Sequence, residues 1–301
     1  MGRRLKICRI LLLIICLFVG IGALVGGICF IVDPSGKLIY MQDMLVYFEV
    51  LPFADILFKD YLFSGFALII VNGITNIVAS YLILRNKKIG YILGTIFGVT
   101  LMAWISIQFY MFEFFVIDLV YFLTGLLQLI IGYICVVSYC QDYFKFSLED
   151  YKEVNKNSDV LTVFFSRKGY SRKIAYEAAN KEQAFIEEIK TSERTEGDLG
   201  FWWCGRFSLH RWGMKIHPLK SDIKDFKKII IVSPIWVFRM CSPIREFIRN
   251  NKDILNDKEV VIVFNHFNPW IVKSAIKEVK TYIKDAKIES KVTMLGHTFT
   301  R

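Results

Sequence analysis

The sequence lacks the cysteine and histidine patterns that mark redox metal centres. Its seven cysteines include no Cys-x-x-Cys pair, and this excludes a ferredoxin-type cluster and a dithiol redox motif. All four histidines lie at or beyond position 210, so the apolar first half has no paired axial ligands for a haem. No metal site is predicted. Cys204 and Cys241 have no base that the sequence places beside them, so both are predicted to be packing residues and not nucleophiles.

The long apolar runs of the first 140 residues have no charged side chain near their centres. Four runs cover residues 10–32, 61–84, 89–111 and 116–140, and each supplies the roughly 20 residues of helix that cross a bilayer. Because charges inside a membrane usually mark ion or proton pathways, the pattern predicts anchoring and oligomerisation and not transport. Gly90-x-x-x-Gly94-x-x-x-Gly98 is the sharpest helix-contact motif. A quinone site between the helices stays open.

Cations flank the apolar runs asymmetrically. Four Lys or Arg residues precede the first run and three fill the tight loop between the second and third, whereas the connection 33–60 is mostly acidic. The positive-inside rule therefore predicts a multi-pass protein of the cell membrane with both termini on the cytoplasmic side. Residues 141–301 carry +8 of the net charge of +10, which suits a cytoplasmic domain beside the anionic lipid bilayer. No nucleic-acid-binding motif is present, so no nucleic-acid partner is expected.

From residue 159 onward, short apolar runs alternate with helical patterns. Strands are predicted over 161–165, 184–189, 229–232, 260–264 and 288–294, and helices over 172–181, 243–250 and 269–284. This alternation predicts a parallel sheet covered on both faces. The chain then divides into a four-helix membrane domain at 1–140, a juxtamembrane linker at 141–159 and a cytoplasmic α/β domain at 160–301.

Three loops follow predicted strands at the carboxyl edge of this sheet, where open α/β sheets bind ligands. They are 166–171, 233–239 and 265–268. The first has the form Ser166-x-x-Gly169-x-Ser171, a hydroxyl-and-glycine corner between a strand and a helix. Such corners hold anions, often phosphates, at a helix N-terminus. The loop has neither a Gly-Lys-Ser/Thr ending nor Gly-x-Gly-x-x-Gly, so ATP hydrolysis and dinucleotide binding are not predicted.

This loop and the later segment IIIVSPIWVFRMCSPIREFI (229–248) together resemble the FMN-binding flavodoxin family, over roughly residues 160–301. The resemblance implies a flavodoxin-like five-stranded parallel sheet of order 2-1-3-4-5 with FMN as cofactor. The positions that match the family's phosphate contacts are Ser166, Lys168, Gly169, Tyr170 and Ser171. The positions that match its flavin-ring loops are Pro234, Ile235, Trp236, Asn265, His266 and Phe267. Arg167 and Arg172 would add charge beside the phosphate.

The resemblance implies electron transfer or an FMN-dependent oxidoreductase at the cytoplasmic face of the membrane, with a redox protein or a quinone as partner. A quinone reductase and a protoporphyrinogen-type oxidoreductase are the enzyme alternatives. A sensor or scaffold that keeps the fold without flavin is the alternative of another class.

Two segments depart from the family pattern. Segment 191–220, rich in Trp, Arg and His, is expected to replace the second helix; it could cap the flavin, receive a partner or enter the membrane interface. Only seven residues follow Met294, too few for a terminal helix. Because the strands resemble doubly buried ones, we expect the juxtamembrane segment 142–154 or a second copy in a homodimer to cover that face. An amphipathic helix on the membrane is its alternative role.

Overall fold

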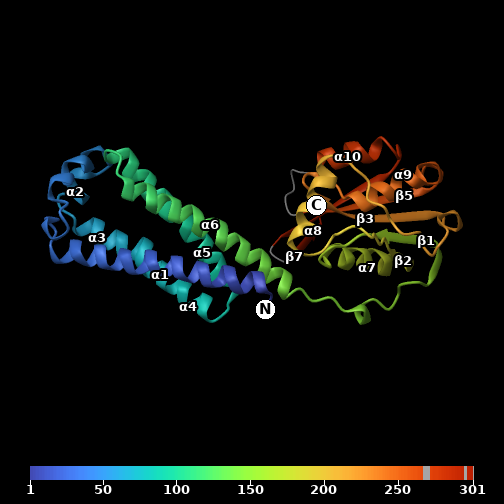
Figure 1. The fold of residues 1–301 in the computed structure, drawn as a ribbon, viewed down its shortest axis with the longest axis horizontal. Helices are drawn as coiled ribbons and strands as arrows, with labels where there is room; N and C mark the ends of the chain where they lie inside the picture. The colour runs from blue at the N-terminus through green and yellow to red at the C-terminus, as the bar shows by residue number, and fades with distance from the viewer. Residues whose placement is uncertain (267–271, 295–296, 301) are drawn as a thin grey trace. The chain divides into compact units, whose positions relative to one another are not determined.

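The computed structural model describes residues 1–266, 272–294 and 297–300. At 158, 198, 292–294 and 297–300 it describes the backbone alone. The chain divides into two compact units, Met1–Tyr143 and Phe144–Arg301. Unit 1 consists of helices, and unit 2 is a sheet with helices on both faces (Figure 1).

Unit 1 is described at every residue and contains four helices that are long and apolar enough to cross a membrane. They are α1 (Arg3–Val32), the composite helix Leu62–Leu84, α5 (Lys88–Met111) and α6 (Val116–Asp142). The composite helix joins α3 (Leu62–Leu68), a π-helical turn η3 (Ile69–Ile74) and α4 (Thr75–Leu84). Short helices fill the connection after α1: η1 (Lys37–Ile39), η2 (Gln42–Val50) and α2 (Ala54–Leu57). The four predicted runs are therefore helices, and α1 also includes the basic residues ahead of its run.

Glycines bring α5 and α6 into backbone contact. A Cβ atom on Gly98 would lie 2.7 Å from the carbonyl oxygen of Gly125 and 2.7 Å from the amide nitrogen of Leu129. A Cβ atom on Gly94 would lie 3.3 Å from a methyl carbon of Leu12 on α1. The predicted glycine motif thus packs helices of one chain against each other, and these two positions are not available for contact with a second copy.

A buried amide joins three helices of unit 1. Nε2 of Gln128 on α6 donates to Oδ1 of Asn76 on α4 at 2.8 Å and to the carbonyl of Gly94 on α5 at 3.0 Å. Hydrogen bonds of this kind hold helices together where water is absent. The buried Asn72 side chain, in the π-helical turn, makes no hydrogen bond to the described part of the chain.

Unit 2 alternates strands and helices, as predicted. Its strands are β1 (Asn157–Phe164), β2 (Ala184–Glu188), β3 (Lys228–Trp236), β4 (Arg239–Met240), β5 (Glu259–His266), β6 (Lys287–Met294) and β7 (His297–Thr300). Its helices are η4 (Leu148–Asp150), α7 (Tyr170–Glu182), α8 (Gly197–Leu209), η5 (Ile223–Asp225), α9 (Ser242–Asn256) and α10 (Lys273–Lys280).

The sheet has the order β2-β1-β3-β5-β6-β7, with β4 paired to β3 outside this path. The first five of these strands pair in parallel. Renumbered among themselves they read 2-1-3-4-5, which is the flavodoxin-like order and confirms the predicted fold. The antiparallel strands β4 and β7 were not predicted.

Apolar clusters fill the space on both faces of the sheet. On one face α7 packs over Val160, Ile230 and Val232. On the other, α9 and α10 cover a larger cluster that includes Ile229 and Ile262. Figure 1 shows α7 on one side of the sheet and α9 and α10 on the other. Because the central strands touch a helix layer on each side, they are apolar at nearly every position.

The last parallel strand does not follow this rule, which corrects the expectation that every strand is buried on both faces. Val261 and Val263 of β5 lie in the cluster beneath α7, and their parallel partners on β6 are Lys287 and Glu289. Parallel partners point to the same face, so β6 presents charged residues there. Lys291 of β6 pairs with Glu177 of α7 at 3.6 Å. This face needs no further apolar cover at β6.

The juxtamembrane segment belongs to unit 2 and packs beside α7. The Phe146 and Tyr151 rings lie 5.2 Å and 5.6 Å from the Tyr176 ring of α7. Val154 packs against the apolar cluster beneath the same helix. The segment therefore covers the α7 side of the sheet with irregular chain and the short helix η4, and not with a long amphipathic helix.

Three helix predictions need correction. Segment 191–220 contains the helix α8 and does not simply replace one. Helix α9 continues to Asn256, beyond the predicted end at position 250. The helix predicted over 269–284 is found as Lys273–Lys280, and its predicted start lies outside the described residues.

A buried ion pair joins α9 and α10. Arg245, with no exposed surface, forms a bidentate pair with Glu278; its Nε contacts Oε1 and its Nη2 lies 3.2 Å from Oε2. The same guanidinium donates to the carbonyls of Met240 at 2.8 Å and Trp212 at 3.0 Å. One side chain thus fixes four separate parts of unit 2.

We predict that Glu278→Ala lowers the free energy of unfolding by about 3–5 kcal/mol, because it leaves a buried guanidinium without its counter-charge. Glu188→Ala, which breaks the partly exposed Arg172–Glu188 pair, should cost less than about 1 kcal/mol. Urea denaturation of the detergent-purified chain, followed by tryptophan fluorescence, measures both. The double change Arg245→Met with Glu278→Leu should recover most of the loss. Equal losses for the two single variants would contradict this account.

Candidate functional site

The three predicted loops meet at the carboxyl edge of the parallel sheet. The ring of Phe165, directly after β1, packs edge-on against Trp236 at the end of β3, with centroids 5.5 Å apart. Nδ2 of Asn265, near the end of β5, donates to Oγ of the buried Ser171 on α7 at 3.3 Å. These two contacts connect the first loop to the second and to the third. The edge lies at the switch point between β1 and β3, where this fold places its ligand.

The first loop makes a tight corner at the start of α7. Oγ of Ser166 accepts a hydrogen bond from the backbone N–H of Gly169 at 3.1 Å. Gly169 has a φ of 92° and caps α7, which starts at Tyr170. A side chain at this φ would be strained, so glycine suits the position. Lys168 is exposed at the tip of the corner.

The first turn of α7 offers backbone donors at this corner. The first N–H groups of any helix have no partner within the helix, and the helix dipole favours an anion beside them. Ser171 lies in this turn, and Asn265 holds its hydroxyl in place. The corner therefore combines backbone donors with two hydroxyls, the usual chemistry of a phosphate cradle.

The two arginines expected beside the phosphate form hydrogen bonds to other parts of unit 2. Nη2 of Arg172 lies 2.8 Å from each carboxylate oxygen of Glu188 on β2. Arg167 donates to the carbonyls of Thr195 and Gly197, both at 2.7 Å. Neither partner is near in sequence, so local reading of the loop could not find them.

Phe144 takes part in the corner, and sequence reasoning missed this. A Cβ atom on Gly169 would lie 2.9 Å from its ring, and its centroid is 4.5 Å from that of Tyr170. The apolar residues among charges in the juxtamembrane segment predicted that this segment covers a face of the sheet, but they did not predict its contact with this loop.

The second predicted loop is a β-hairpin, which corrects its assignment. β3 continues through Pro234 and Ile235 to Trp236, all half-buried, and β4 pairs back onto it at Arg239. Val237 and Phe238 form the turn, with φ values of 44° and 63°. Turns with two positive φ values match the twist of a hairpin but ordinarily use Asn or Gly, so this sequence gave no turn signal.

The third loop also begins later than predicted. Asn265 and His266 are the last residues of β5 and are buried. Nε2 of His266 lies 2.6 Å from Oγ of Ser290 on β6. Phe267 lies outside the described residues. Asn265 is thus the member of this set that the structure joins to the phosphate corner.

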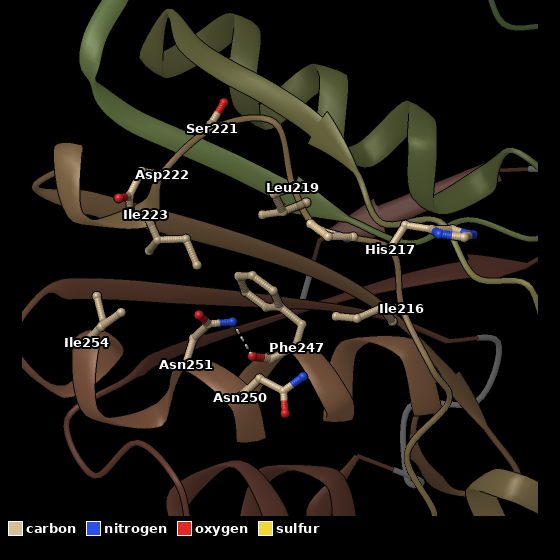
Figure 2. A pocket seen from close by; sticks show the side chains of 11 residues that line it. Ile216, His217, Leu219, Ser221, Asp222, Ile223, Phe247, Asn250, Asn251 and Ile254 are labelled. Carbon is tan, nitrogen blue, oxygen red and sulfur yellow. Dashed lines mark hydrogen bonds between the residues drawn. The ribbon is translucent and has the colours of Figure 1, made fainter.

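A separate cleft of about 340 Å³ lies away from this edge. Figure 2 shows it between the chain segment 216–223, which leads into β3, and the second half of α9. Asn251 donates to the carbonyl of Phe247 at 2.8 Å, and the His217 ring is directed away from the two asparagines. None of the predicted site residues lines this cleft, and its lining offers no paired acid and base.

The two buried thiols of unit 2 are packing residues. Cys241 caps α9, a position that ordinarily lowers a thiol pKa. Burial outweighs this and raises the pKa of Cys241 to about 12, although Oγ of Ser233 donates to its sulfur. Burial likewise raises the pKa of Cys204 to about 11. Neither thiol is ionised near neutral pH.

Comparison with known proteins finds distant structural likenesses, three of which are described here. A flavoprotein of Lactobacillus acidophilus NCFM, crystallised with FMN, is 20% identical and matches 44% of this chain and 91% of its own, with a TM-score of 0.37. A protein described as a flavoprotein, from Bacteroides eggerthii DSM 20697, is 20% identical over 44% of this chain and 86% of its own, with a TM-score of 0.38. Another so described, from Bacteroides uniformis ATCC 8492, is 18% identical over 47% and 97%, with a TM-score of 0.39.

No protein-family model matches the chain, and no curated protein does. At these scores and identities the structural likenesses add nothing to what the strand order shows.

We predict that Cys204 and Cys241 resist alkylation in the folded protein. At about pH 8, iodoacetamide should modify each at least about a hundredfold more slowly than in urea, because burial keeps the thiols protonated and covered. Peptide mass spectrometry measures each site separately. A cysteine introduced at the exposed Ser192 should react at an ordinary rate. Fast modification of Cys241 in the folded chain would show an accessible thiolate at the start of α9.

Proposed function

We propose that unit 2 binds FMN noncovalently at the carboxyl edge of its sheet. The observation that carries the proposal is the corner at Gly169. Its left-handed backbone, with Ser166 before it and Ser171 after it, opens helix α7 between β1 and β3. A flavodoxin-like sheet places its flavin phosphate at this position.

The residues present fit a bound phosphate. The first N–H groups of α7 and the Ser166 and Ser171 hydroxyls would hold it, with the Lys168 ammonium nearby. Asn265 orients the Ser171 hydroxyl. Phe144 covers the Gly169 corner and would exclude water from the far side of the loop.

The residues of the β3–β4 hairpin would orient the flavin ring. Trp236 is half-buried and is held edge-on by Phe165, so one of its faces would stack on the isoalloxazine while Pro234 and Ile235 line the same edge. When bound, FMN supplies one- and two-electron transfer, and the protein supplies binding and orientation. Burial of Cys204 and Cys241 leaves no thiolate to take part.

We infer that this chemistry takes place at the cytoplasmic face of a membrane. Four helices of unit 1 are apolar and long enough to cross a bilayer, and the flanking cations favour cytoplasmic termini. The function that these features support best is electron transfer or oxidoreduction by a membrane-anchored flavoprotein, with a soluble reductant on the cytoplasmic side and a quinone or a redox protein as partner.

We expect the purified chain to show the near-ultraviolet and blue absorption bands of an oxidised flavin. Titration of the apoprotein should give a Kd for FMN about a hundredfold below that for riboflavin, because riboflavin lacks the phosphate that the Gly169 corner binds. Trp236→Ala should weaken FMN binding about tenfold through lost stacking. Phe185→Ala, an aromatic change on β2, is the matched control.

Two results would count against this proposal. Equal affinity for FMN and riboflavin would contradict phosphate binding at the Gly169 corner. A chain that stays colourless in excess FMN would favour a flavin-free sensor or scaffold.

We expect four membrane crossings with both termini in the cytoplasm. An enzymatic reporter fused after Arg301 should be active as a cytoplasmic fusion, and a reporter inserted near Gln42 should be active only outside, because cations gather at one end of the helices. The opposite pair of results would separate unit 2 from any cytosolic reductant.

A further inference from the structure

Unit 2 exposes a concentrated group of large apolar side chains, here named the aromatic face. Ten large apolar residues of the described part of unit 2 are strongly exposed, and eight of them belong to α8, the turn after it and the hairpin tip. They are Leu199, Phe201, Trp202, Trp203, Leu209, Trp212, Val237 and Phe238. The two parts are continuous, because a Cβ atom on Gly205 of α8 would lie 3.3 Å from a methyl of Val237. Exposed apolar patches of this kind mark protein or membrane contacts.

Helix α8 buries small residues and exposes large aromatic ones, the reverse of an ordinary amphipathic helix. Its buried stripe consists of Gly200, Cys204 and Ser208, spaced four residues apart. Its large rings point outward instead, and Trp202 is 72% exposed. A helix that packed to stabilise the core would bury the rings. The large aromatic residues of α8 are therefore not explained by packing of the core.

The aromatic face carries arginines among its rings. Residues 199–212 contain Arg206 and Arg211 and no Asp or Glu, and Nε1 of Trp203 donates to the Glu193 carboxylate at 3.1 Å. The Arg206 guanidinium lies 5.9 Å from the Trp203 ring and 5.7 Å from the Trp212 ring, and the His210 ring stacks on Trp212 at 4.6 Å. Tryptophan beside arginine is the composition of the membrane–water interface, where rings enter the acyl boundary and cations meet anionic headgroups.

The face shares one edge of unit 2 with Phe144, the first residue of that unit. Phe144 packs on Gly169 and Tyr170. In the same loop Arg167 bonds to the carbonyls of Thr195 and Gly197 and lies 5.4 Å from the Phe201 ring at the start of α8. Phe144 follows the end of α6 by two residues, a distance that covalent geometry limits to about 8 Å.

We propose that the aromatic face docks on the anionic headgroup surface of the bilayer that unit 1 spans. This rests on the proposed membrane insertion of unit 1. The occupant is lipid because the covalent chain keeps this edge near the end of a membrane-spanning helix and because the Arg206 guanidinium lies between exposed tryptophan rings of the face. Tethering raises the effective concentration of bilayer at the face, so each contact need contribute little on its own.

The test uses the full chain in lipid nanodiscs. Trp104 is the only tryptophan of unit 1, so in a Trp104→Phe background all tryptophan fluorescence comes from unit 2. Emission is compared between discs with plain phosphatidylglycerol and discs with phosphatidylglycerol brominated near the headgroup. Bromine quenches only tryptophans that reach the lipid, and the ratio cancels any quenching by flavin. The difference in quenching between the unsubstituted chain and the Trp104→Phe chain comes from Trp104, and it measures the insertion of unit 1 separately.

Docking predicts strong quenching in the Trp104→Phe chain. Phe201→Ser removes an anchor but no tryptophan and should reduce the quenching, whereas Phe185→Ser on β2 should not. Arg206→Gln should lower the docked-to-undocked ratio about fivefold in phosphatidylglycerol discs and have less effect in phosphatidylcholine discs. Lys252→Gln, an exposed change on α9, is the matched charge control.

Three results would overturn the proposal. The first is absence of quenching in unit 2 while Trp104 is quenched. The second is equal quenching with and without Phe201. The third is a blue shift of unit 2 emission that follows protein concentration in detergent, which would assign the face to a second copy of the chain.

Discussion

The buried Arg245–Glu278 pair is the constraint on which the functional edge of unit 2 depends. A guanidinium without exposed surface must have every donor paired, and Arg245 finds its acceptors on α9, α10, the end of β4 and the chain at Trp212. If one of these parts moved independently, the buried Arg245 guanidinium would lose a hydrogen-bond acceptor. The hairpin that carries Trp236 and the turn that carries Trp212 are therefore held by one side chain. The flavin-facing and lipid-facing surfaces proposed above share this support.

The Gly169 corner shows a second coupling, between the juxtamembrane chain and the loop that opens α7. The Phe144 ring would lie 2.9 Å from a Cβ atom of residue 169, and Phe146 and Tyr151 continue the contact along α7 to Tyr176. A displacement of this segment would uncover the loop from behind. The chain that follows α6 is thus part of the loop's environment, whereas its composition predicted cover for the sheet or an amphipathic helix on the membrane.

The sequence predicted what depends on local pattern and missed what depends on distant partners. Buried strands such as β3 and β5 were predicted because both of their faces touch helices, which makes their sequences apolar at nearly every position. The Ser166–Gly169–Ser171 corner was predicted because hydroxyls and glycine at this spacing between a strand and a helix are typical of an anion-binding loop. The turn at Val237 and Phe238 was invisible, since its positive φ values are imposed by strand pairing on residues that disfavour them. The roles of Arg167 and Arg172 were decided by Thr195, Gly197 and Glu188, which only the folded chain brings near.

The same contrast explains why the outer surface of α8 has to be understood separately from its inner one. Small residues on the inner side let the helix approach the β3–β4 hairpin closely: Oγ of Ser208 donates to the carbonyl of Met240 at 3.1 Å, and a Cβ atom on Gly205 would lie 3.3 Å from a methyl of Val237. That approach leaves no room for rings on the inner side, so Phe201 and Trp202 must face outward. Packing accounts for the small residues but not for the choice of tryptophan and arginine opposite them. The bilayer surface proposed above as the docking partner is apolar and anionic, and it would account for that choice.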